Sequence, residues 1–233
     1  ESFANEGCDV VLVSRDPASL ASAAEAIRGA AQVNVQVMAA DLSKGEDRQR
    51  VHAAFPDMDI LVNNAGAIPA GRLQDISMER WVEAWNLKVL GYIHMCQLYL
   101  PGMEARGAGS IVNIIGMAGR AHKAGYIAGS AGNASLIAFT EALGSAAQEK
   151  GVQVVGINPA VTKTDRMLTQ ARTNARIRLG DENRWAETLT GLPFGRPIEA
   201  GEIADLAVFL ASPRGHYVNG TVVDVDGGGM FRV

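Results

Sequence analysis

The side chains best able to move a proton lie in the middle of this chain, between residues 116 and 133. Tyr126 stands at or just before the start of a helix predicted over about 127–149, and a phenol can serve as a general acid or base. A nearby ammonium group would lower the pKa of that phenol, but Asn133 is neutral and can only hydrogen-bond hydroxyl groups through its amide. Tyr126 could equally be a packing residue and Ser130 a helix cap, so both interpretations stay open.

Two further segments have the composition of nucleotide-binding loops. Asn63-Asn64-Ala65-Gly66 follows the apolar run 59–62, and its small residues would let the backbone approach a ribose closely; a strand-end turn is the alternative. Ser14-Arg15 follows the apolar run 10–13, where an acidic residue would bind a ribose 2′-hydroxyl and an arginine accommodates a 2′-phosphate. Because position 14 is a serine and Arg15 follows it, the sequence favours NADP over NAD, with a solvated loop arginine as the alternative.

The composition is that of a globular protein with one large core. The chain has 233 residues, 48% of them hydrophobic, and a net charge of −4, which indicates neither a nucleic-acid partner nor an anionic membrane surface. No apolar run approaches the roughly 18 residues that a membrane span needs. The four histidines show no metal-ligand spacing, so no metal is expected. Cys8 and Cys96 are too few for a disulfide framework and are expected to be core thiols, which predicts a reducing, cytoplasmic location.

Strand-like apolar runs alternate with helical patterns along the whole chain, which predicts a single α/β domain over 1–233 with a doubly wound parallel sheet. Residues 163–193 are polar and charged, and they predict short helices or a flexible substrate flap. The predicted strands are 10–13, 33–38, 59–62, 110–115, 152–157 and 220–225. The predicted helices are 19–29, 48–54, 79–104, 127–149 and 199–211.

Several motifs together resemble the short-chain dehydrogenase/reductase family. Ile111-Val112-Asn113-Ile114 and Phe139-Thr140-Glu141-Ala142-Leu143 carry the frame of its active-site block, and Asn63-Asn64-Ala65-Gly66 matches its cofactor motif. Asn158-Pro159-Ala160 resembles its Asn-Pro-Gly segment, and Asp226-Gly227-Gly228 resembles its C-terminal end. The resemblance spans nearly the whole chain. It implies a Rossmann-type fold, NAD(P) as cofactor, a small-molecule substrate and a homo-oligomer, either a dimer or a tetramer.

The resemblance also assigns residues to a site. In the family, the pair matching 41–42 contacts adenine, with an ordinary turn residue as the alternative, and the Asn-Pro-Gly segment with its threonine holds the nicotinamide amide. A helix asparagine holds a water of the proton relay, which implies this role for Asn86; an asparagine bonded to backbone is the alternative. The implied cofactor contacts are Ser14, Arg15, Asp41, Leu42, Asn63, Ala65, Gly66, Asn133, Pro159, Thr162 and Thr164.

The same register removes the family's usual catalytic side chains. Its Ser, Tyr and Lys positions fall on Gly116, Gly129 and Asn133. The two glycines have no side chain, and losing acid–base assistance typically costs about 10²–10⁴ in rate. Tyr126 lies three residues before Gly129, about one helical turn away, and its hydroxyl could reach the same cleft. A second register places Tyr126 at the Tyr position and Ser130 at the Lys position, but it requires three extra residues in the helix that follows.

The beginning of the chain is unusual for such a fold. Residues 1–7 resemble the C-terminal end of its first helix, so the first strand and the Gly-rich phosphate loop are absent from this sequence. That strand belongs in the middle of the sheet, where its absence would leave backbone groups of both neighbours unpaired. We therefore expect the chain to be a fragment of a longer protein, with a rearranged sheet that closes the gap as the alternative.

Two functions fit these residues. The first is an NADP-preferring oxidoreductase that moves a hydride between nicotinamide and an alcohol or ketone, with a rearranged acid/base set centred on Tyr126 and Asn86. The second is a catalytically inactive nucleotide-binding or subunit-like relative. Gly116, Gly129 and Asn133 favour the second function, whereas the intact segment 63–66 favours the first. We prefer the oxidoreductase because hydride transfer depends largely on positioning by the cofactor site.

Overall fold

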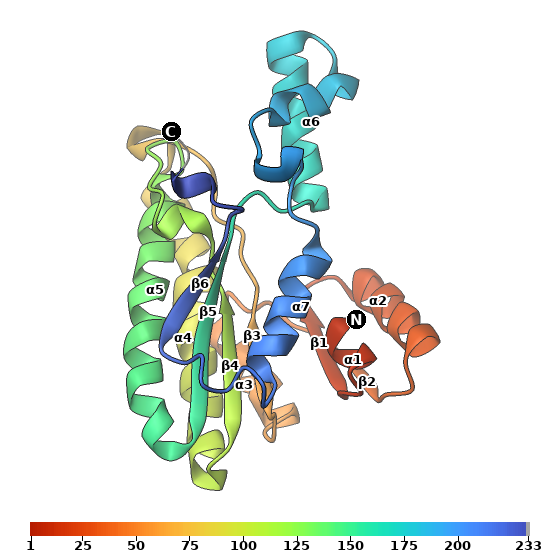
Figure 1. The fold of residues 1–233 in the computed structure, drawn as a ribbon, viewed down its shortest axis with the longest axis vertical. Coiled ribbons are helices and arrows are strands. Elements are labelled where there is room, and N and C mark those ends of the chain that lie inside the picture. Colours follow the sequence, from red (N-terminus) through yellow and green to blue (C-terminus); the bar gives the residue numbers. More distant parts are fainter. Residues whose placement is uncertain (232–233) are drawn as a thin grey trace.

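The computed structural model describes residues 1–231, apart from the side chains of Arg166, Gln170 and Asn174. Its strands are all parallel and form two separate ladders, one in the order β1-β2 and one in the order β3-β4-β5-β6 (Figure 1). The strands are β1 (Val10–Ser14), β2 (Val35–Ala39), β3 (Ile60–Asn63), β4 (Gly109–Ile114), β5 (Val152–Pro159) and β6 (Thr221–Val225). The predicted strands are therefore all present, within a few residues of their expected ends.

The helices also match the periodic segments of the sequence, and local chemistry explains several of their ends. The Asp16 carboxylate accepts hydrogen bonds from the first turn of α2, whose first residue is Pro17. The helix α4 begins after the cap Ser77 and ends at Gly107, whose φ of 68° favours glycine. The helices are α1 (Ser2–Asn5), α2 (Pro17–Ala30), α3 (Gly45–Ala54), α4 (Met78–Arg106), α5 (Ile127–Ala147), α6 (Asp165–Leu179) and α7 (Ala200–Ala211).

The four-stranded sheet is the centre of the protein, with helices on both faces. The helices α4 and α5 cover one face and α7 covers the other (Figure 1). Successive side chains of a strand point to opposite faces, so Ile111 packs with Met95 and Tyr99 of α4, whereas Val112 packs against α7. Because both faces are covered, seven of the eight residues of β5 are buried.

The two-stranded sheet is thinner and lies apart from the other in Figure 1. It carries α2 on one side, and Val13, Met38 and Ala40 connect it to the core around Leu61. No ladder joins β1 to β3 within residues 1–231, so the rearranged sheet that would close the gap is not what the structure has. Only one residue of β2, Val35, is fully buried.

Residues 163–193 form a helical hairpin that projects from the sheet (Figure 1). It consists of α6 and a 3-10 helix at Glu182–Leu189, and Ala171 and Ala175 are its buried contacts. One of its helices is longer than the short helices predicted, because α6 has 15 residues. The predicted movement of this flap stays a prediction. None of the helices within residues 1–231 has the length and apolarity to cross a membrane.

Candidate active site

The carboxyl end of β4 is held by two buried asparagines, at the edge where open parallel sheets bind ligands. The backbone N–H of Gly116 donates to Oδ1 of Asn158 (3.2 Å), and Nδ2 of Asn133 donates to the carbonyl of Gly116 (3.3 Å). Gly116 has a φ of 134°, which favours glycine, and a Cβ atom there would lie 3.0 Å from Nδ2 of Asn133. The glycine therefore allows α5 and β4 to approach closely at this point.

The amide of Asn133 is only half satisfied. The whole residue is only 4% exposed, and its buried Oδ1 has no hydrogen-bond partner among the described residues. A buried acceptor without a partner costs about 1–3 kcal/mol. The oxygen lies at the end of β4, so a ligand hydroxyl that reached it would remove this cost.

Tyr126 occupies the space that a side chain at Gly129 would need. A Cβ atom at Gly129 would overlap the Cε1 and Cζ atoms of the Tyr126 ring. On α5, positions 129 and 133 are four residues apart and lie on the same face, about 5–6 Å from each other. The ring of Tyr126 therefore stands about one turn before Asn133 on the face that meets the end of β4. The structure brings Tyr126, Gly129, Asn133 and Gly116 together.

Packing also fixes the ring of Tyr126. It is half-buried against a small apolar cluster of Ile68, Ile76, Ala84 and Ala128. The segment before the helix is held by Ser130, whose hydroxyl accepts from the backbone N–H of Lys123 (3.0 Å). Ser130 is not the helix cap that the sequence left open, because it lies within α5 and its hydroxyl holds the preceding loop instead. His122 and Lys123 are exposed.

Lys88 brings a cation from α4 to this edge of the sheet. Its Nζ donates to the carbonyl oxygens of Ile114 (3.0 Å) and Ile115 (2.9 Å), the two residues before Gly116. The Nζ atom also lies 5.3 Å from the centre of the Tyr92 ring, and the Tyr92 hydroxyl donates to Ile114 as well (3.0 Å). Carbonyl oxygens and a π face are favourable surroundings for an ammonium, so α4 holds a positive charge at the end of β4.

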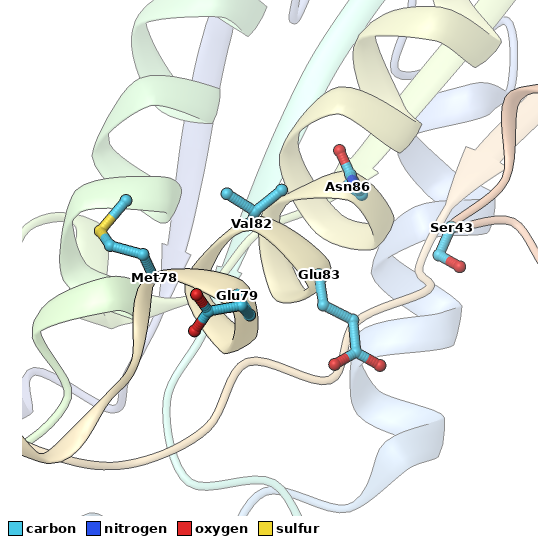
Figure 2. A pocket seen from close by; sticks show the side chains of 6 residues that line it. All are labelled: Ser43, Met78, Glu79, Val82, Glu83 and Asn86. Carbon is cyan, nitrogen blue, oxygen red and sulfur yellow. The ribbon is translucent and has the colours of Figure 1, made fainter.

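Asn86 does not reach this point, although its assignment to a proton relay requires that it should. Asn86 and Lys88 are two residues apart on α4, so their side chains point about 200° apart around the helix. The side chain of Asn86 lines an open pocket of about 530 Å³ on another side of α4 (Figure 2). Its backbone carbonyl accepts from Nη1 of Arg48 (3.1 Å). The position of this side chain does not support the predicted proton-relay role of Asn86. The other residues that line this pocket are Ser43, Met78, Glu79, Val82 and Glu83.

The predicted cofactor segment 63–66 divides into a buried part and an exposed part. Nδ2 of Asn63 donates to Oδ1 of Asn113 (2.9 Å), and Nδ2 of Asn113 donates to the Thr140 hydroxyl (3.0 Å). This relay joins β3, β4 and α5, so the Asn63 amide is committed to the core. Gly66 is exposed, and a Cβ atom there would lie 2.8 Å from Cδ of Lys88. The half-buried Ala65 and the exposed Gly66 offer backbone to a ligand, and the absence of a side chain at Gly66 leaves room for Lys88.

Arg15 directly follows β1, and Asp41 follows β2 by two residues, so both belong to the carboxyl end of the two-stranded sheet. Arg15 and Ser14 are exposed, and Leu42 is half-buried with its carbonyl bound to Nη1 of Arg48 (2.7 Å). Burial opposes ionisation of Asp41, but hydrogen bonds from Ser43 and the positive charge of Arg15 outweigh it and hold the pKa of Asp41 below its ordinary value. Two groups predicted to bind the adenosine part of a cofactor are therefore electrostatically coupled.

The segment after β5 has mostly local contacts. Pro159 ends β5, and the Thr162 hydroxyl donates to the carbonyl of Ala160 (3.2 Å). The Thr164 hydroxyl caps α6 by accepting from the N–H of Met167 (3.2 Å). Contacts from Pro159, Thr162 and Thr164 to a nicotinamide stay predictions.

Two site residues were missed by sequence reasoning. Asn158 was noted only as part of its motif, and Lys88 was not considered. A signal for Lys88 was present in the sequence. Trp85, Lys88 and Tyr92 share one face of α4 at helical spacing, and Trp85 Nε1 donates to the carbonyl of Ala128 on α5 (3.1 Å). A single lysine between two aromatic residues on an inward-facing side of a helix indicates that its ammonium group has a specific binding position.

Known proteins resemble this chain over most of its length. The family model described as Enoyl-(Acyl carrier protein) reductase matches residues 1–229. The 3-oxoacyl-(acyl-carrier-protein) reductase FabG of Vibrio cholerae is 32% identical over 207 residues, which is 86% of this chain and 79% of that protein. An acetoacetyl-CoA reductase of Rhizobium meliloti is 32% identical over 184 residues, covering 78% of this chain and 72% of the relative.

Solved structures agree with this assignment. The L-sorbose reductase of Gluconobacter frateurii, complexed with NADPH and L-sorbose, superimposes with a TM-score of 0.92 and 28% identity, covering 100% of this chain and 90% of that one. YwfH, an NADPH-dependent reductase involved in bacilysin biosynthesis, has a TM-score of 0.89 and 26% identity, covering 99% of this chain and 92% of that one. The single Rossmann-like α/β domain, its parallel strands and these relatives show that the chain belongs to the short-chain dehydrogenase/reductase family.

Proposed function

We propose that this protein is an NADP-preferring oxidoreductase that moves a hydride between nicotinamide and the carbon of an alcohol or ketone, with Tyr126 as its acid/base. The observation that carries the proposal is the position of the Tyr126 ring in the side-chain space of Gly129. A phenol is thereby available on the face of α5 that carries Asn133 and meets Gly116. The prediction for Asn86 is not kept, because its side chain lies on another face of α4.

The residues at the ends of the parallel strands suit a dinucleotide with ribose hydroxyls. The unpartnered Oδ1 of Asn133 is an acceptor for such a hydroxyl, and the exposed Gly66 allows close approach of backbone to ligand. The L-sorbose reductase of similar structure is complexed with NADPH. Contacts from Pro159, Thr162 and Thr164 to the nicotinamide amide belong to the same proposal. When bound, the cofactor supplies or accepts the hydride.

The work left to the protein is to handle one proton. In the oxidation of an alcohol, the hydroxyl proton would pass to the oxygen of an ionised Tyr126, while the bound cofactor would accept the hydride. In reduction, the neutral Tyr126 hydroxyl donates that proton to the carbonyl oxygen as the hydride arrives. Asn133 binds and orients, and Asn158 fixes the backbone of Gly116 beside them.

Preference for the phosphorylated cofactor rests on Arg15. Its exposed guanidinium can pair with a 2′-phosphate, and it directly follows β1, near enough to Asp41 for its charge to help lower the pKa of that carboxyl. Ser14 beside it offers a hydroxyl, and Asp41 and Leu42 would contact adenine. Replacing Arg15 with alanine should weaken NADPH binding far more than NADH binding.

A catalytically inactive dinucleotide-binding protein is the second candidate. Gly116 and Gly129 favour it, because neither can touch a substrate oxygen through a side chain. Tyr126 would then be only a packing residue of the cluster around Ile68 and Ile76. The two candidates agree on cofactor binding and differ on turnover.

The decisive experiment measures binding and turnover on the same preparations. Thermal stability is followed with NADPH and with NADH, where a ligand at about 100 times its Kd adds roughly 2.7 kcal/mol. Ketone reduction is then assayed for the unchanged protein, for Tyr126→Phe and for the control Tyr217→Phe, whose ring is fully exposed. We expect Tyr126→Phe to lose at least about tenfold in kcat with unchanged NADPH binding, because only the proton donor is removed. Equal turnover of the two variants would refute the role of Tyr126. Binding without any turnover would support the second candidate.

We also propose that the protein works as a homo-oligomer, a dimer or tetramer, in the cytoplasm. Met78, Val82 and Leu90 lie along one side of α4 at helical spacing and are about half or more exposed, which suits contact with a second copy. The two cysteines are unpaired, in keeping with a reducing compartment.

A further inference from the structure

We infer that Lys88 supplies the positive charge of this active site, in place of the charge that the neutral Asn133 cannot supply, and supports Tyr126 as the acid/base. This inference rests on the proposed function of Tyr126. It concerns a residue of α4, whereas the position that lacks the charge is on α5.

The backbone of β4 connects the two sides of the site. Lys88 holds the carbonyl of Ile115, and Asn133 holds the carbonyl of Gly116, which is the next residue along the chain. Consecutive residues have Cα atoms about 3.8 Å apart. The ammonium of Lys88 and the amide of Asn133 therefore reach the same short piece of backbone from two different helices.

The helices connect them a second time, at Tyr126. Ala84 lies one turn before Lys88 on α4 and packs in the apolar cluster that the Tyr126 ring also contacts. On α5, the Tyr126 ring lies over Gly129, one turn before Asn133. Tyr126 and Lys88 thus lie along the contact between α4 and α5, connected through Ala84 on one side and through Asn133 and β4 on the other. The hydrogen bond from Trp85 to the carbonyl of Ala128 holds α4 and α5 together between these two points.

Other ionisable groups lie near this helix contact. Tyr92 lies beside Lys88 on α4, and complete burial raises its pKa, while Arg48 of α3 donates to the backbone carbonyl of Asn86. The loop before α5 carries His122 and Lys123, both exposed, and Asp75 lies on the segment that pairs with Tyr126 through Gly71. The apolar side chains of Ile68, Ile76, Ala84 and Ala128 pack around the Tyr126 ring. A half-buried ammonium acts more strongly on a neighbouring phenol than an exposed one, because less solvent screens it.

The physical role follows from charge. An ammonium within about 4–6 Å favours the ionised form of an acid and lowers its pKa by about 1–3 units. Lys88 would stabilise the ionised Tyr126 that accepts the proton of an alcohol, without itself touching the substrate. The two carbonyls of β4 orient Lys88 for this role. Lys88 is thus a supporting residue, and its removal should change the pKa of Tyr126 as well as the rate.

The test titrates Tyr126 directly, without cofactor or substrate. Tyrosinate absorbance is recorded against pH for the unchanged protein, Lys88→Met, Lys88→Gln and Lys88→Arg. The curve of the same protein carrying Tyr126→Phe is then subtracted from each, which leaves the titration of Tyr126. The subtraction removes the exposed Tyr217, while burial raises the pKa of Tyr99 to about 12 and moves it out of the working range. Lys88→Gln keeps a donor for the carbonyls but no charge, and Lys88→Arg keeps the charge. Lys150→Met, at an exposed lysine, is the control.

We expect the pKa of Tyr126 to rise by at least about one unit in Lys88→Met and Lys88→Gln, and to stay near its original value in Lys88→Arg and Lys150→Met. Equal pKa values in the unchanged protein and Lys88→Gln would overturn the inference, and so would an equal rise in Lys88→Arg. Should Lys88→Met fail to fold, Lys88→Gln and Lys88→Arg still decide it. NADPH binding and ketone reduction measured on the same proteins keep the two proposals apart. A protein without turnover overturns the proposed function, while the titration still reads the effect of Lys88.

Discussion

The two sheets of this protein differ in what supports them and in the residues that they carry. The four-stranded sheet is covered by α4 and α5 on one face and by α7 on the other, and β5 is buried almost throughout. The two-stranded sheet has β1 half-buried along most of its length and only one fully buried residue in β2. The difference is visible in Figure 1, where β1 and β2 lie to one side of the compact main body.

The proposed function divides proton chemistry and nucleotide recognition between these sheets. Lys88, Asn133 and Tyr126 are fixed by buried contacts around β4, whereas Arg15 and Asp41 stand at the exposed end of β1 and β2. A group that must hold a proton within hydrogen-bond reach needs a rigid support. A group that attracts a phosphate through charge tolerates a looser one. We therefore expect changes in the larger sheet to act on stability and rate, and changes in the smaller sheet to act on affinity and local opening.

The largest expected contrast is in the reactivity of the two thiols, one beside each sheet. Cys96 is 1% exposed on α4, and burial raises the pKa of its thiol to about 12. Cys8 is half-buried before β1. In the native protein a thiol reagent should label Cys8 at least about 10³ times faster than Cys96, because labelling of Cys96 needs unfolding of the core.

The measurement is a time course of labelling read by mass spectrometry, with Cys8→Ser to identify the fast site. If both thiols react at the same rate, the two sheets open as one unit and the contrast between them is wrong. If Cys96 is the faster thiol, the core assignment itself is wrong.

Equal truncations in the two sheets should have unequal effects on stability. Ile157 of β5 is fully buried between Val112 and the α7 residues. Ile157→Ala should lower the free energy of unfolding by about 2–5 kcal/mol, because it removes contacts and leaves a cavity. Leu12 of β1 is only half-buried, so Leu12→Ala should cost clearly less. Urea unfolding with an unchanged m-value measures both, and a Leu12→Ala loss as large as that of Ile157→Ala would contradict the comparison.

Breaking the asparagine relay of the larger sheet should have the next largest effect on the free energy of unfolding. Asn113→Ala would leave Nδ2 of Asn63 with only the long contact to Cys96 Sγ (3.6 Å), and the Thr140 hydroxyl with only its bond to the Leu136 carbonyl (2.7 Å). We expect a loss of about 1–3 kcal/mol in the free energy of unfolding, because a buried polar group without a partner keeps its desolvation cost. Asn5→Ala, at an exposed residue of α1, is the matched control and should change stability by less than about 0.5 kcal/mol. Equal losses in the two variants would mean that the relay contributes nothing.

Most of the fold could be predicted from the sequence, and the reasons differ by region. Apolar runs such as 152–157 and the long helical period of α4 are local signals, and Asp16 and Gly107 fix helix ends through their own chemistry. The separation of the strands into two ladders could not be predicted from periodicity, because pairing depends on residues distant in the chain. For the same reason, the sequence suggested that the amide of Asn63 binds a ligand, whereas in the structure it donates to Asn113 of the neighbouring strand.

The site was less predictable than the fold because it depends on which face each helix presents. Asn86 and Lys88 are two residues apart, and only the packing of Trp85 and Lys88 against α5 and β4 decides between their faces. The place of Tyr126 could be proposed from the sequence as a reach of one turn. That its ring would fill the space above Gly129 depends on the backbone at the start of α5.

The smallest expected effect is a pH dependence confined to the smaller sheet. The folded pKa of Asp41 lies below its ordinary value of 3.8, so its ionised form is favoured by folding. This contribution is present above pH 3.8 and is lost as the pH falls through the folded pKa. Asp41→Asn should therefore be slightly less stable than the unchanged protein near neutral pH, with the difference shrinking in acid, and should open β1 and β2 more readily while leaving the core closed. Faster labelling of Cys8 at neutral pH, with Cys96 unchanged, is the expected result. Faster labelling of both thiols would mean that the charges of Arg15 and Asp41 support the whole protein, and the division between a rigid chemical sheet and a looser recognition sheet would have to be abandoned.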